Sequence, residues 1–431
     1  MNRIRRAACD VAVVGAGPAG MAAAAVAAEA GLSVLLLDDN VFPGGQIWRR
    51  ERTAANRSAS RWLDRLERAQ AKTICGASVF HVHQGRLAAE QADGVLEVSF
   101  SKLILATGAR ERFLPFPGWT LPGVIGAGAL QSLIKAGLPV AGKRIVVAGT
   151  GPLLLAVAAY ARENGAAIVC IAEQASRASF LGFGLRALLS GSHSAAALGL
   201  LRRLRGIPHW TGSWPVAALG KGSLEAVRLA RGRARIEFSC NYLACGFHLV
   251  PSTELAELAG CRLERGFVAV DSRQETSVTG VFCAGEGTGV GGFERALLEG
   301  QIAGYASAGR DESALRLVRR RRAAERHVRS MGRAFALRAE LKSLPDNDTV
   351  VCRCEDVRFG SLRGFPSWRA AKLATRCGMG PCQGRVCSAA AEFLFGWEAP
   401  RARSPVFPVS CASLAQIDCE PNPDTLQGGL R

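Results

Sequence analysis

The apolar residues near the start of the chain form two short runs, separated by a glycine-rich turn and an alanine-rich helix. Cys9–Val14 reads as a β-strand, followed by the turn Gly15–Gly20, a helix to about Ala30 and a second strand over Ser33–Leu37. The uncharged stretch from Val11 to Ala28 has the length of a membrane span, but glycines and a proline in its middle break a continuous helix. The pattern instead predicts a βαβ unit of the length that binds dinucleotides.

The residue types in this unit suit a dinucleotide site. Gly15 allows a tight turn, Gly17 lets a pyrophosphate approach the backbone, and Gly20 permits close packing of helix and strand. The helix N-terminus offers unpaired N–H groups and the positive end of its dipole to the phosphates. Asp38 is the eighteenth residue after Gly20, where a carboxylate can accept hydrogen bonds from a ribose. The candidate binding residues of this unit are Gly15, Gly17, Pro18, Ala19, Gly20 and Asp38.

Three more small-residue turns add candidates. One ends the buried strand Leu103–Leu105, and another ends the apolar run Val281–Ala284 and precedes a helix from about Glu294 to Ser307. There the Glu286 carboxylate and the helix N-terminus could both address one ligand. Pro43–Gln46 holds two glycines that suit backbone close to a flat ligand, although a simple loop explains them as well. The further candidates are Gly45, Gln46, Ala106, Thr107, Gly108, Gly285, Glu286 and Gly292.

A second βαβ unit follows in the middle of the chain. Its strands are Arg144–Ala148 and Ala167–Ile171, and Gly149 and Gly151 form its turn. Leu154 stands where the third glycine of the fingerprint is expected, which holds helix and strand further apart. Glu173 is one residue late compared with Asp38. The pattern predicts a βαβ fold here, but whether it binds NAD(P) or another adenine nucleotide is left open.

The chain is strongly basic, with 54 Lys and Arg against 36 Asp and Glu and a formal net charge of +18. Such a surface favours acidic partners, anionic membranes or nucleic acid, yet no basic motif interleaved with aromatics supports nucleic acid. The charge is concentrated in the expected helix 310–344, which includes Arg319–Arg322. We expect a solvated linker helix with apolar contacts at Leu315, Val318, Val328, Met331 and Phe335, with a docking face for an acidic partner as the alternative.

Most of the fourteen cysteines stand singly among apolar residues, as buried thiols do, but one group is different. Cys352 and Cys354 form a C-x-C pair, and Cys382 and Cys387 form a C-x4-C pair. Four thiolates can surround one soft metal centre, and these spacings depart from the C-x2-C knuckles of structural zinc. They favour a 2Fe–2S cluster over zinc. Cys377 is a fifth candidate ligand. Cys240 and Cys245 have similar spacing but read as strand core.

Taken in order, these motifs resemble the flavoproteins of the glutathione- and thioredoxin-reductase type, with an added C-terminal cluster domain. The segments 43–49, 352–357 and 378–385 resemble more specifically the alpha subunits of bacterial opine oxidases. Related alpha-type subunits occur in proline and hydroxyproline dehydrogenases and in hydrogen cyanide synthase. The resemblance covers nearly the whole chain from Asp10 to about Trp397, and the last segment is its most specific part.

The resemblance implies an α/β fold with two Rossmann-like dinucleotide-binding domains and a small 2Fe–2S domain similar to bacterioferritin-associated ferredoxin. FAD would bind at Gly15, Gly17, Gly20, Asp38, Gln46, Thr107, Gly108 and Glu286, and the matching cluster ligands are Cys352, Cys354, Cys382 and Cys387. The expected organisation is an FAD-binding domain over 1–115 and 240–310, an inserted second nucleotide-binding-like domain over 116–239, a basic helical linker over 311–348, the cluster domain over 349–399 and a Pro-rich tail over 400–431.

The resemblance also implies a hetero-oligomer that oxidises an amine, an opine or (hydroxy)proline. The substrate is then oxidised at a flavin on a separate beta subunit, a small ferredoxin-like 2Fe–2S gamma subunit often joins them, and the alpha chain relays electrons. We expect a cytoplasmic protein, with peripheral contact to the inner membrane as an alternative. No residue is assigned a catalytic role, because none of the six histidines lies in a recognisable motif and no redox-active cysteine pair adjoins the flavin motifs.

Two other functions stay open. One is a free-standing NAD(P)H-dependent reductase that passes electrons to a ferredoxin-like acceptor, which would need a working site at Gly149 and Gly151. The other is a scaffold that keeps the fold without cofactors.

Overall fold

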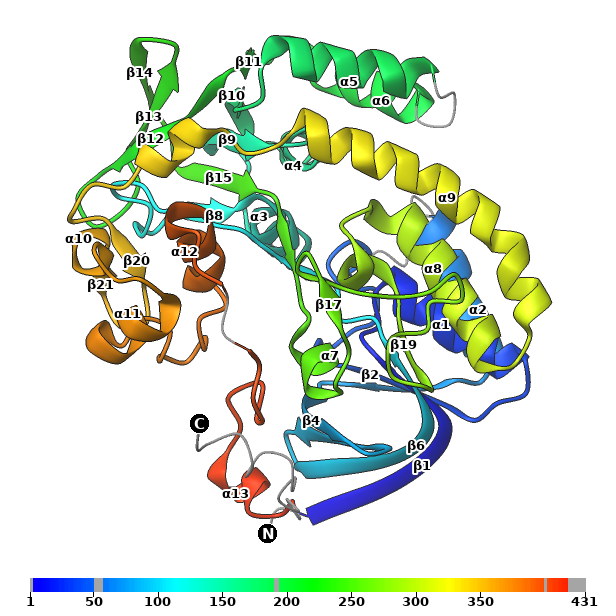
Figure 1. The fold of residues 1–431 in the computed structure, drawn as a ribbon. Coiled ribbons are helices and arrows are strands. Elements are labelled where there is room, and N and C mark those ends of the chain that lie inside the picture. The colour runs from blue at the N-terminus through cyan, green and yellow to red at the C-terminus, as the bar shows by residue number, and fades with distance from the viewer. Residues whose placement is uncertain (1–2, 50–56, 190–193, 399–400, 418–431) are drawn as a thin grey trace.

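The N-terminal βαβ unit forms the centre of the first sheet in the computed structural model, which describes residues 3–49, 57–189, 194–398 and 401–417 (Figure 1). β1 (Arg3–Val14) lies parallel to β2 (Val34–Asp38) and to β6 (Gly94–Leu105), and β19 (Val281–Cys283) lies parallel to β6. The strand order is β3-β2-β1-β6-β5-β4, where β3 is Lys72–Cys75, β4 is Ser78–His83 and β5 is Arg86–Gln91. The carboxyl ends of these parallel strands share one edge, so the turns that follow them meet there.

α1 (Pro18–Glu29) is covered on both sides, which explains its alanine-rich sequence. It packs between the sheet and α8 (Gly292–Ser307), and α2 (Arg57–Arg68) lies against it (Figure 1). A Cβ added at Gly300 of α8 would lie 2.1 Å from the backbone oxygen of Ala19. The two helices therefore touch backbone to backbone, an approach that only small residues allow.

The second βαβ unit forms a separate sheet of five parallel strands. Its order is β11-β10-β9-β15-β8, where β8 is Val124–Gly126, β9 is Arg144–Thr150, β10 is Ala167–Glu173, β11 is His209–Thr211 and β15 is Tyr242–Phe247. The helices of this unit are α3 (Ala127–Lys135), α4 (Leu153–Glu163), α5 (Arg177–Leu189) and α6 (Ser194–Arg203). An antiparallel sheet of β12 (Ser213–Leu219), β13 (Ala226–Arg231) and β14 (Ala234–Ser239) completes it.

The expected return to the first domain at residue 240 is wrong. β15 pairs with β9, with Tyr242 opposite Ile145, and therefore belongs to the second sheet. The chain leaves the first unit through β7 (Ala109–Glu111) and returns through β16 (Leu249–Pro251), and these two strands pair with each other. After the return come α7 (Glu254–Leu258), β17 (Leu263–Glu264), β18 (Phe267–Val268) and the short helix η1 (Gly285–Thr288).

The basic helix forms as predicted and connects the two large units. α9 (Asp311–Ala334) packs along α8 and reaches α5 at its far end (Figure 1). Val318 and Phe335 are buried, as expected, whereas Leu315 is 53% exposed and makes no core contact. The short helix η2 (Ala339–Ser343) then leads into the cysteine-rich region.

The cysteine-rich region is a small domain with its own apolar core. Its elements are β20 (Val350–Cys352), β21 (Val357–Arg358), α10 (Phe359–Leu362), α11 (Trp368–Thr375) and α12 (Cys387–Phe395). The described part of the tail, with α13 (Cys411–Leu414), runs back to the first domain and packs on β4 and β5. Among the described residues, no helix is both long and apolar enough to cross a membrane.

Candidate functional site

Gly15 and Gly20 have the local conformation and packing that the fingerprint predicts, and Gly17 faces open space. Gly15 has a φ of +103°, and a Cβ there would lie 2.2 Å from the backbone oxygen of Ala106. A Cβ on Gly20 would lie 1.7 Å from the backbone oxygen of Gly15. The backbone of Gly15 therefore leaves no room for a side chain at Gly20. A Cβ on Gly17 would meet nothing within 4 Å. Open space therefore lies in front of Gly17 at the N-terminus of α1, where a pyrophosphate fits.

Substitution of these glycines separates folding from ligand binding. Gly15→Ala should lower the free energy of unfolding by about 1–3 kcal/mol from backbone strain alone. Gly17→Ala should fold normally but bind FAD more weakly, because the added methyl group occupies the space before the turn. Thermal unfolding of the apoprotein and FAD bound per chain measure the two effects. Unchanged FAD affinity in Gly17→Ala would contradict a pyrophosphate at this turn.

Asp38 organises the same turn. Its carboxylate is 6% exposed and accepts hydrogen bonds from the Ala16 N–H and from the backbone and side-chain nitrogens of Asn40 (2.8 and 2.7 Å). Oδ1 accepts both hydrogen bonds from Asn40, so the remaining acceptor capacity is on Oδ2, which accepts one from Ala16. A hydrogen bond from a ribose to Asp38 stays a prediction, and the contacts with Ala16 and Asn40 add a second role in holding the loop.

The loop Pro43–Gln46 lies against the fingerprint turn, although its sequence was equally compatible with a simple loop. The Gly44 N–H donates to the Ala16 oxygen (2.8 Å), and a Cβ on Gly45 would lie 3.0 Å from Gly17 Cα. The Gln46 side chain accepts a hydrogen bond from the Ser132 hydroxyl (3.0 Å). The two glycines thus bring this loop beside the open space before α1.

The turn after β6 also reaches this edge. The Ala106 N–H donates to the Val14 oxygen (2.8 Å), which sets this turn directly beside the fingerprint. The Thr107 hydroxyl donates to the Ser252 oxygen (2.5 Å), and Gly108 has a φ of +69°. This turn and the two described before it therefore surround one space.

Glu286 acts differently from the expectation. Its carboxylate accepts hydrogen bonds from the N–H groups of Gly291 and Gly292 (3.0 and 3.1 Å), so acid and helix N-terminus address each other rather than a shared ligand. Burial raises the pKa of this carboxyl. Gly285 lies close to α1, since a Cβ there would be 3.0 Å from Ala19 Cβ. The η1 turn therefore contributes the backbone of Gly285, rather than the Glu286 carboxylate, to this edge of the sheet.

A buried ionic network behind η1 is not predicted by the sequence pattern. Glu299 is fully buried and pairs with Arg295 (2.8 Å) and Arg321 (3.1 Å). Its second oxygen accepts hydrogen bonds from the Gly285 N–H (3.0 Å) and the Thr288 hydroxyl (2.7 Å). The signal that could have found it is an i,i+4 Arg–Glu pair in a helix otherwise lined with alanine and glycine.

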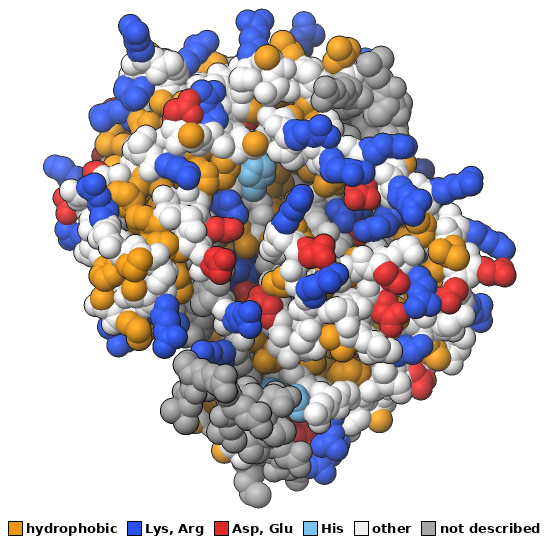
Figure 2. Space-filling model, in the orientation of Figure 1, with side chains coloured by type: hydrophobic (Ala, Val, Ile, Leu, Met, Phe, Trp, Pro, Cys, Tyr) orange, Lys and Arg blue, Asp and Glu red, His pale blue; other side chains and the backbone are white. Residues whose placement is uncertain are grey.

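The four consecutive arginines of α9 are not equivalent. Arg321 is 15% exposed and belongs to the Glu299 network, so it is not part of a solvated face. Arg319, Arg320 and Arg322 are exposed. Figure 2 shows Lys and Arg side chains gathered on the surface over α9. The exposed basic face of α9 thus includes Arg319, Arg320 and Arg322, but not Arg321.

The carboxylate of Glu173, at the end of the second strand of the second βαβ unit, accepts its hydrogen bonds from the protein itself. Glu173 is 1% exposed and accepts hydrogen bonds from the Thr150 hydroxyl (2.9 Å), the Gly151 N–H (2.7 Å) and the Ala175 N–H (2.8 Å). The Gly151 N–H would face a phosphate in a nucleotide site, but here it already donates to Glu173. Leu154 also fills its expected position, with a side-chain carbon 3.4 Å from a Cβ on Gly246.

The end of α9 covers the same turn. The carbonyl oxygen of Phe335 accepts hydrogen bonds from the Thr150 hydroxyl (3.2 Å) and from His248 Nε2 (2.8 Å). The Phe335 ring is 1% exposed and packs edge-on against Phe180 and Phe183. Residues 335–338 are thus bonded to Thr150 in the turn and to Gln174 after β10, which places the chain's own backbone beside the second turn.

The cysteine-rich region brings three of its five candidate ligands into one group and holds the other two as a pair. The sulfur atoms of Cys352, Cys377 and Cys387 lie within 4.8 Å of one another, and all three residues are buried. Cys354 is exposed and its thiol is hydrogen-bonded with Cys382. Hydrogen bonds from the Cys377 and Cys387 thiols lower the pKa of Cys352.

Glycines let the two cysteine loops meet. A Cβ on Gly380 would lie 2.3 Å from Cys354 Cβ, and one on Gly378 would lie 2.5 Å from the Trp368 ring. The C-x-C loop and the loop before α12 therefore touch with no side chain between them. The three clustered sulfurs, with the Cys354–Cys382 pair on the adjoining loops, form a donor set for a soft metal or an iron–sulfur cluster.

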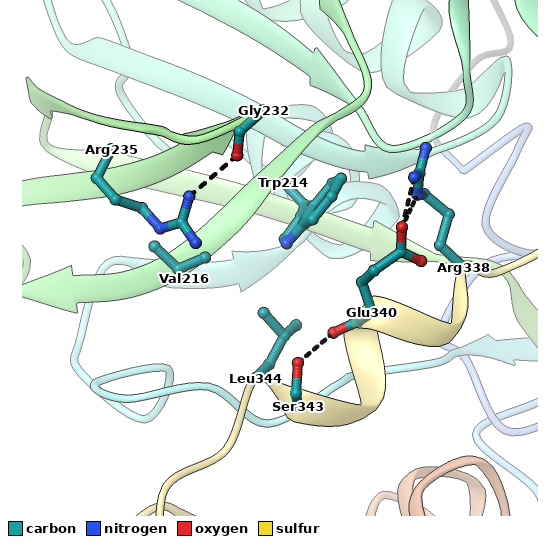
Figure 3. A pocket seen from close by; sticks show the side chains of 8 residues that line it. All are labelled: Trp214, Val216, Gly232, Arg235, Arg338, Glu340, Ser343 and Leu344. Carbon is teal, nitrogen blue, oxygen red and sulfur yellow. Dashed lines mark hydrogen bonds and ion pairs between the residues drawn. The ribbon is translucent and has the colours of Figure 1, made fainter.

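A hollow elsewhere on the molecule contains none of the candidate residues. It has a volume of about 540 Å³ and lies between the β12–β14 sheet and η2 (Figure 3). Trp214 and Arg338 face each other in it, and Arg338 is paired with Glu340. It is separate from both the fingerprint edge and the cysteines.

Comparisons with known proteins agree with the geometry. The opine oxidase A chain of Agrobacterium tumefaciens (strain Ach5) is 33% identical over 95% of this chain and 92% of its own. Hydrogen cyanide synthase subunit HcnB of Pseudomonas aeruginosa is 30% identical over 95% of this chain and 98% of its own. The solved structure of L-proline dehydrogenase from P. horikoshii has a TM-score of 0.70 at 20% identity, covering 96% of this chain and 81% of that one.

These similarities confirm the resemblance and the α/β fold class predicted from the motifs. Residues 9–308 match the pyridine nucleotide-disulphide oxidoreductase family. The chain therefore belongs to the pyridine nucleotide-disulphide oxidoreductase family and is an FAD-dependent oxidoreductase, related to the A subunits of opine oxidases.

Proposed function

We propose that this chain is the FAD- and 2Fe–2S-containing electron-transfer subunit of a hetero-oligomeric dehydrogenase that oxidises an amine, an opine or (hydroxy)proline. It would relay electrons from a substrate-oxidising flavoprotein beta subunit, and its further partner would be a small ferredoxin-like 2Fe–2S gamma subunit. The similarity to proteins named as subunits supports the assembly. The relay itself rests on contacts between two places. One is the edge of the first sheet at which the Gly15–Gly20 turn lies, here called the flavin edge, and the other is the loop 377–387, here called the cysteine loop.

A short bonded path connects these two places, and it is the observation that carries the proposal. Arg110 follows Gly108 of the flavin edge by two residues, and its Nε donates to the backbone oxygen of Arg385 (3.1 Å). Arg385 in turn donates to the Cys382 oxygen (3.2 Å). Glu254 pairs with both arginines (2.8 and 3.5 Å). The cysteine loop is therefore fastened to the flavin edge by charge-assisted bonds, as a relay between two centres requires.

The residues fit the proposed cofactors in different ways. Gly15, Gly17, Gly45 and Gly108 would hold the FAD against open backbone, and the cysteines would hold the cluster. FAD, when bound, exchanges two electrons with a donor and single electrons with a cluster. The chain contributes burial, fixed separation and positive charge around the thiolates.

The reductase alternative is disfavoured by the second βαβ unit. Glu173 and the Gly151 N–H, the groups that a ribose and a pyrophosphate would use, already bond each other, and Phe335 bonds the Thr150 hydroxyl. For this reason we propose that the chain neither binds nor is reduced by NADH or NADPH, and that its electrons come from the partner subunit. No residue of the chain is proposed as a catalytic acid or base.

The test is the visible spectrum of the purified chain under anaerobic conditions. We expect flavin bands with broad iron–sulfur absorbance, left unbleached by NADH or NADPH and bleached by dithionite. Rapid bleaching by either nucleotide would instead support a free-standing reductase. Flavin without iron and sulfide would refute the cluster part of the proposal.

The exposed arginines of α9 offer a surface for such a partner. Arg319, Arg320 and Arg322 carry no part of the buried network and suit an acidic protein face. We propose a cytoplasmic complex that binds no nucleic acid, with contact to an anionic inner-membrane surface as the alternative use of the same charges.

A further inference from the structure

The five thiols of the cysteine centre fall into two groups. Cys352, Cys377 and Cys387 form a buried group whose sulfurs lie within 4.8 Å of one another. Cys354 is exposed, and its sulfur is hydrogen-bonded with the backbone and thiol of Cys382 on the solvent side. The thiols thus divide three and two, whereas their order along the chain gives no such division.

A 2Fe–2S cluster takes two thiolates on each iron. By this grouping Cys354 and Cys382 would hold an outer iron and two of the three buried thiols an inner one, and the resemblance makes Cys352 and Cys387 those two. Cys377 is then the extra thiol, and it lies beside the inner iron only. We infer that Cys377 is a reserve ligand of that iron, able to replace Cys387; this rests on the proposed function, which supplies the cluster.

The backbone around Cys377 is fixed in a way that keeps its sulfur in the group. α11 ends at Thr375, Arg376 adopts a left-handed φ of +65°, and Gly378 packs against Trp368 with a φ of +82°. The Cys377 side chain is 1% exposed, and this turn holds its sulfur beside those of Cys352 and Cys387. Cys377 and Cys387 come from different elements, so loss of one leaves the loop of the other unchanged.

The exchange is a simple substitution of thiolates. On exchange the Cys377 thiol would lose its proton as its sulfur bonds iron, and the displaced Cys387 thiolate would take up a proton; in a variant without Cys387, the Cys377 proton would pass to solvent. Neither iron nor sulfur changes oxidation state. We expect the same sulfur not to replace Cys382, which lies outside the group of three.

Iron and acid-labile sulfide per FAD in the full-length chain test the inference, together with the EPR spectrum after dithionite. The variants are Cys377→Ala, Cys387→Ala, the double Cys377→Ala/Cys387→Ala, and Cys382→Ala as the matched control. We expect wild-type iron in Cys377→Ala, retained iron with shifted EPR g values in Cys387→Ala, and loss of iron in the double variant. Cys382→Ala should lose its iron although Cys377 is present.

Two results would overturn the inference. One is loss of iron in Cys387→Ala as complete as in the double variant, and the other is retention of iron in Cys382→Ala. FAD content and far-UV circular dichroism of each variant establish that it folds. Absence of iron and sulfide from the wild-type chain would overturn the proposed function as well, so the two failures are distinguishable.

Discussion

Replacing Glu299 with alanine is expected to lower the free energy of unfolding by about 3–5 kcal/mol, because it leaves buried arginines without a partner. Arg295 is 5% exposed and Arg321 15%, so water cannot solvate them fully in place of the carboxylate. The Gly285 N–H and the Thr288 hydroxyl also lose their acceptor. Urea denaturation monitored by circular dichroism measures the loss. Since Gly285 lies at the flavin edge, FAD retention should fall with it.

Two further variants distinguish this effect from a general change in charge. Arg320→Ala alters an exposed arginine on α9 and should change stability by no more than about 0.5 kcal/mol. The double variant Glu299→Ala/Arg321→Ala should recover part of the loss, because one unpaired buried charge is removed. A loss below about 1 kcal/mol in Glu299→Ala would show that the network is hydrated and weak.

Phe335→Ala is expected to cost about 3–5 kcal/mol of unfolding free energy, as for other fully buried aromatic residues. The ring packs against Phe180 and Phe183 of α5, so its removal leaves a cavity between α5 and the end of α9. The variant should still fail to react with NADH, because Glu173 and Leu154 continue to block the second turn. Urea denaturation and an NADH titration provide the two measurements.

The matched control lies on α5. Leu181 is 57% exposed, and Leu181→Ala should leave stability nearly unchanged. If Phe335→Ala unfolds like the wild type, the contact between α9 and the second unit is not a stabilising one. If it gains reduction by NADH, residues 335–338 alone close an otherwise working nucleotide site.

Local patterns were sufficient for the parts of the site that lie within one βαβ unit. The roles of Gly15 and Gly20 follow from the tight turn and from helix–strand packing, both of which are short-range. Apolar strands followed by small-residue turns also indicated the candidates Thr107 and Gly285, which reach the same edge because parallel strands end together. The Pro43–Gln46 loop could not be placed in this way, since its position depends on contacts with Gly17.

The features that sequence reasoning missed depend on partners far apart in the chain. β15 belongs to the second sheet through pairing with a strand almost a hundred residues earlier, and Glu299 meets Arg321 across two helices. The sequence spacing of the cysteines predicted a common centre. It could not predict the division into three and two, because that depends on how the turn after α11 folds against Trp368.

The described tail has a consequence for how the cysteine domain moves. The N-terminal side of the cysteine domain is held by the Trp119 ring nitrogen, which donates to the Val350 oxygen (2.6 Å). Its C-terminal side continues into residues 401–417, where the Val406 N–H donates to the Phe80 oxygen (3.0 Å) and the Glu90 carboxylate accepts from Ser410 and Ser413. A domain fastened at both ends does not swing between partners as a mobile carrier does. In the proposed relay, electron transfer within the chain would then proceed without conformational gating, at a rate insensitive to solvent viscosity.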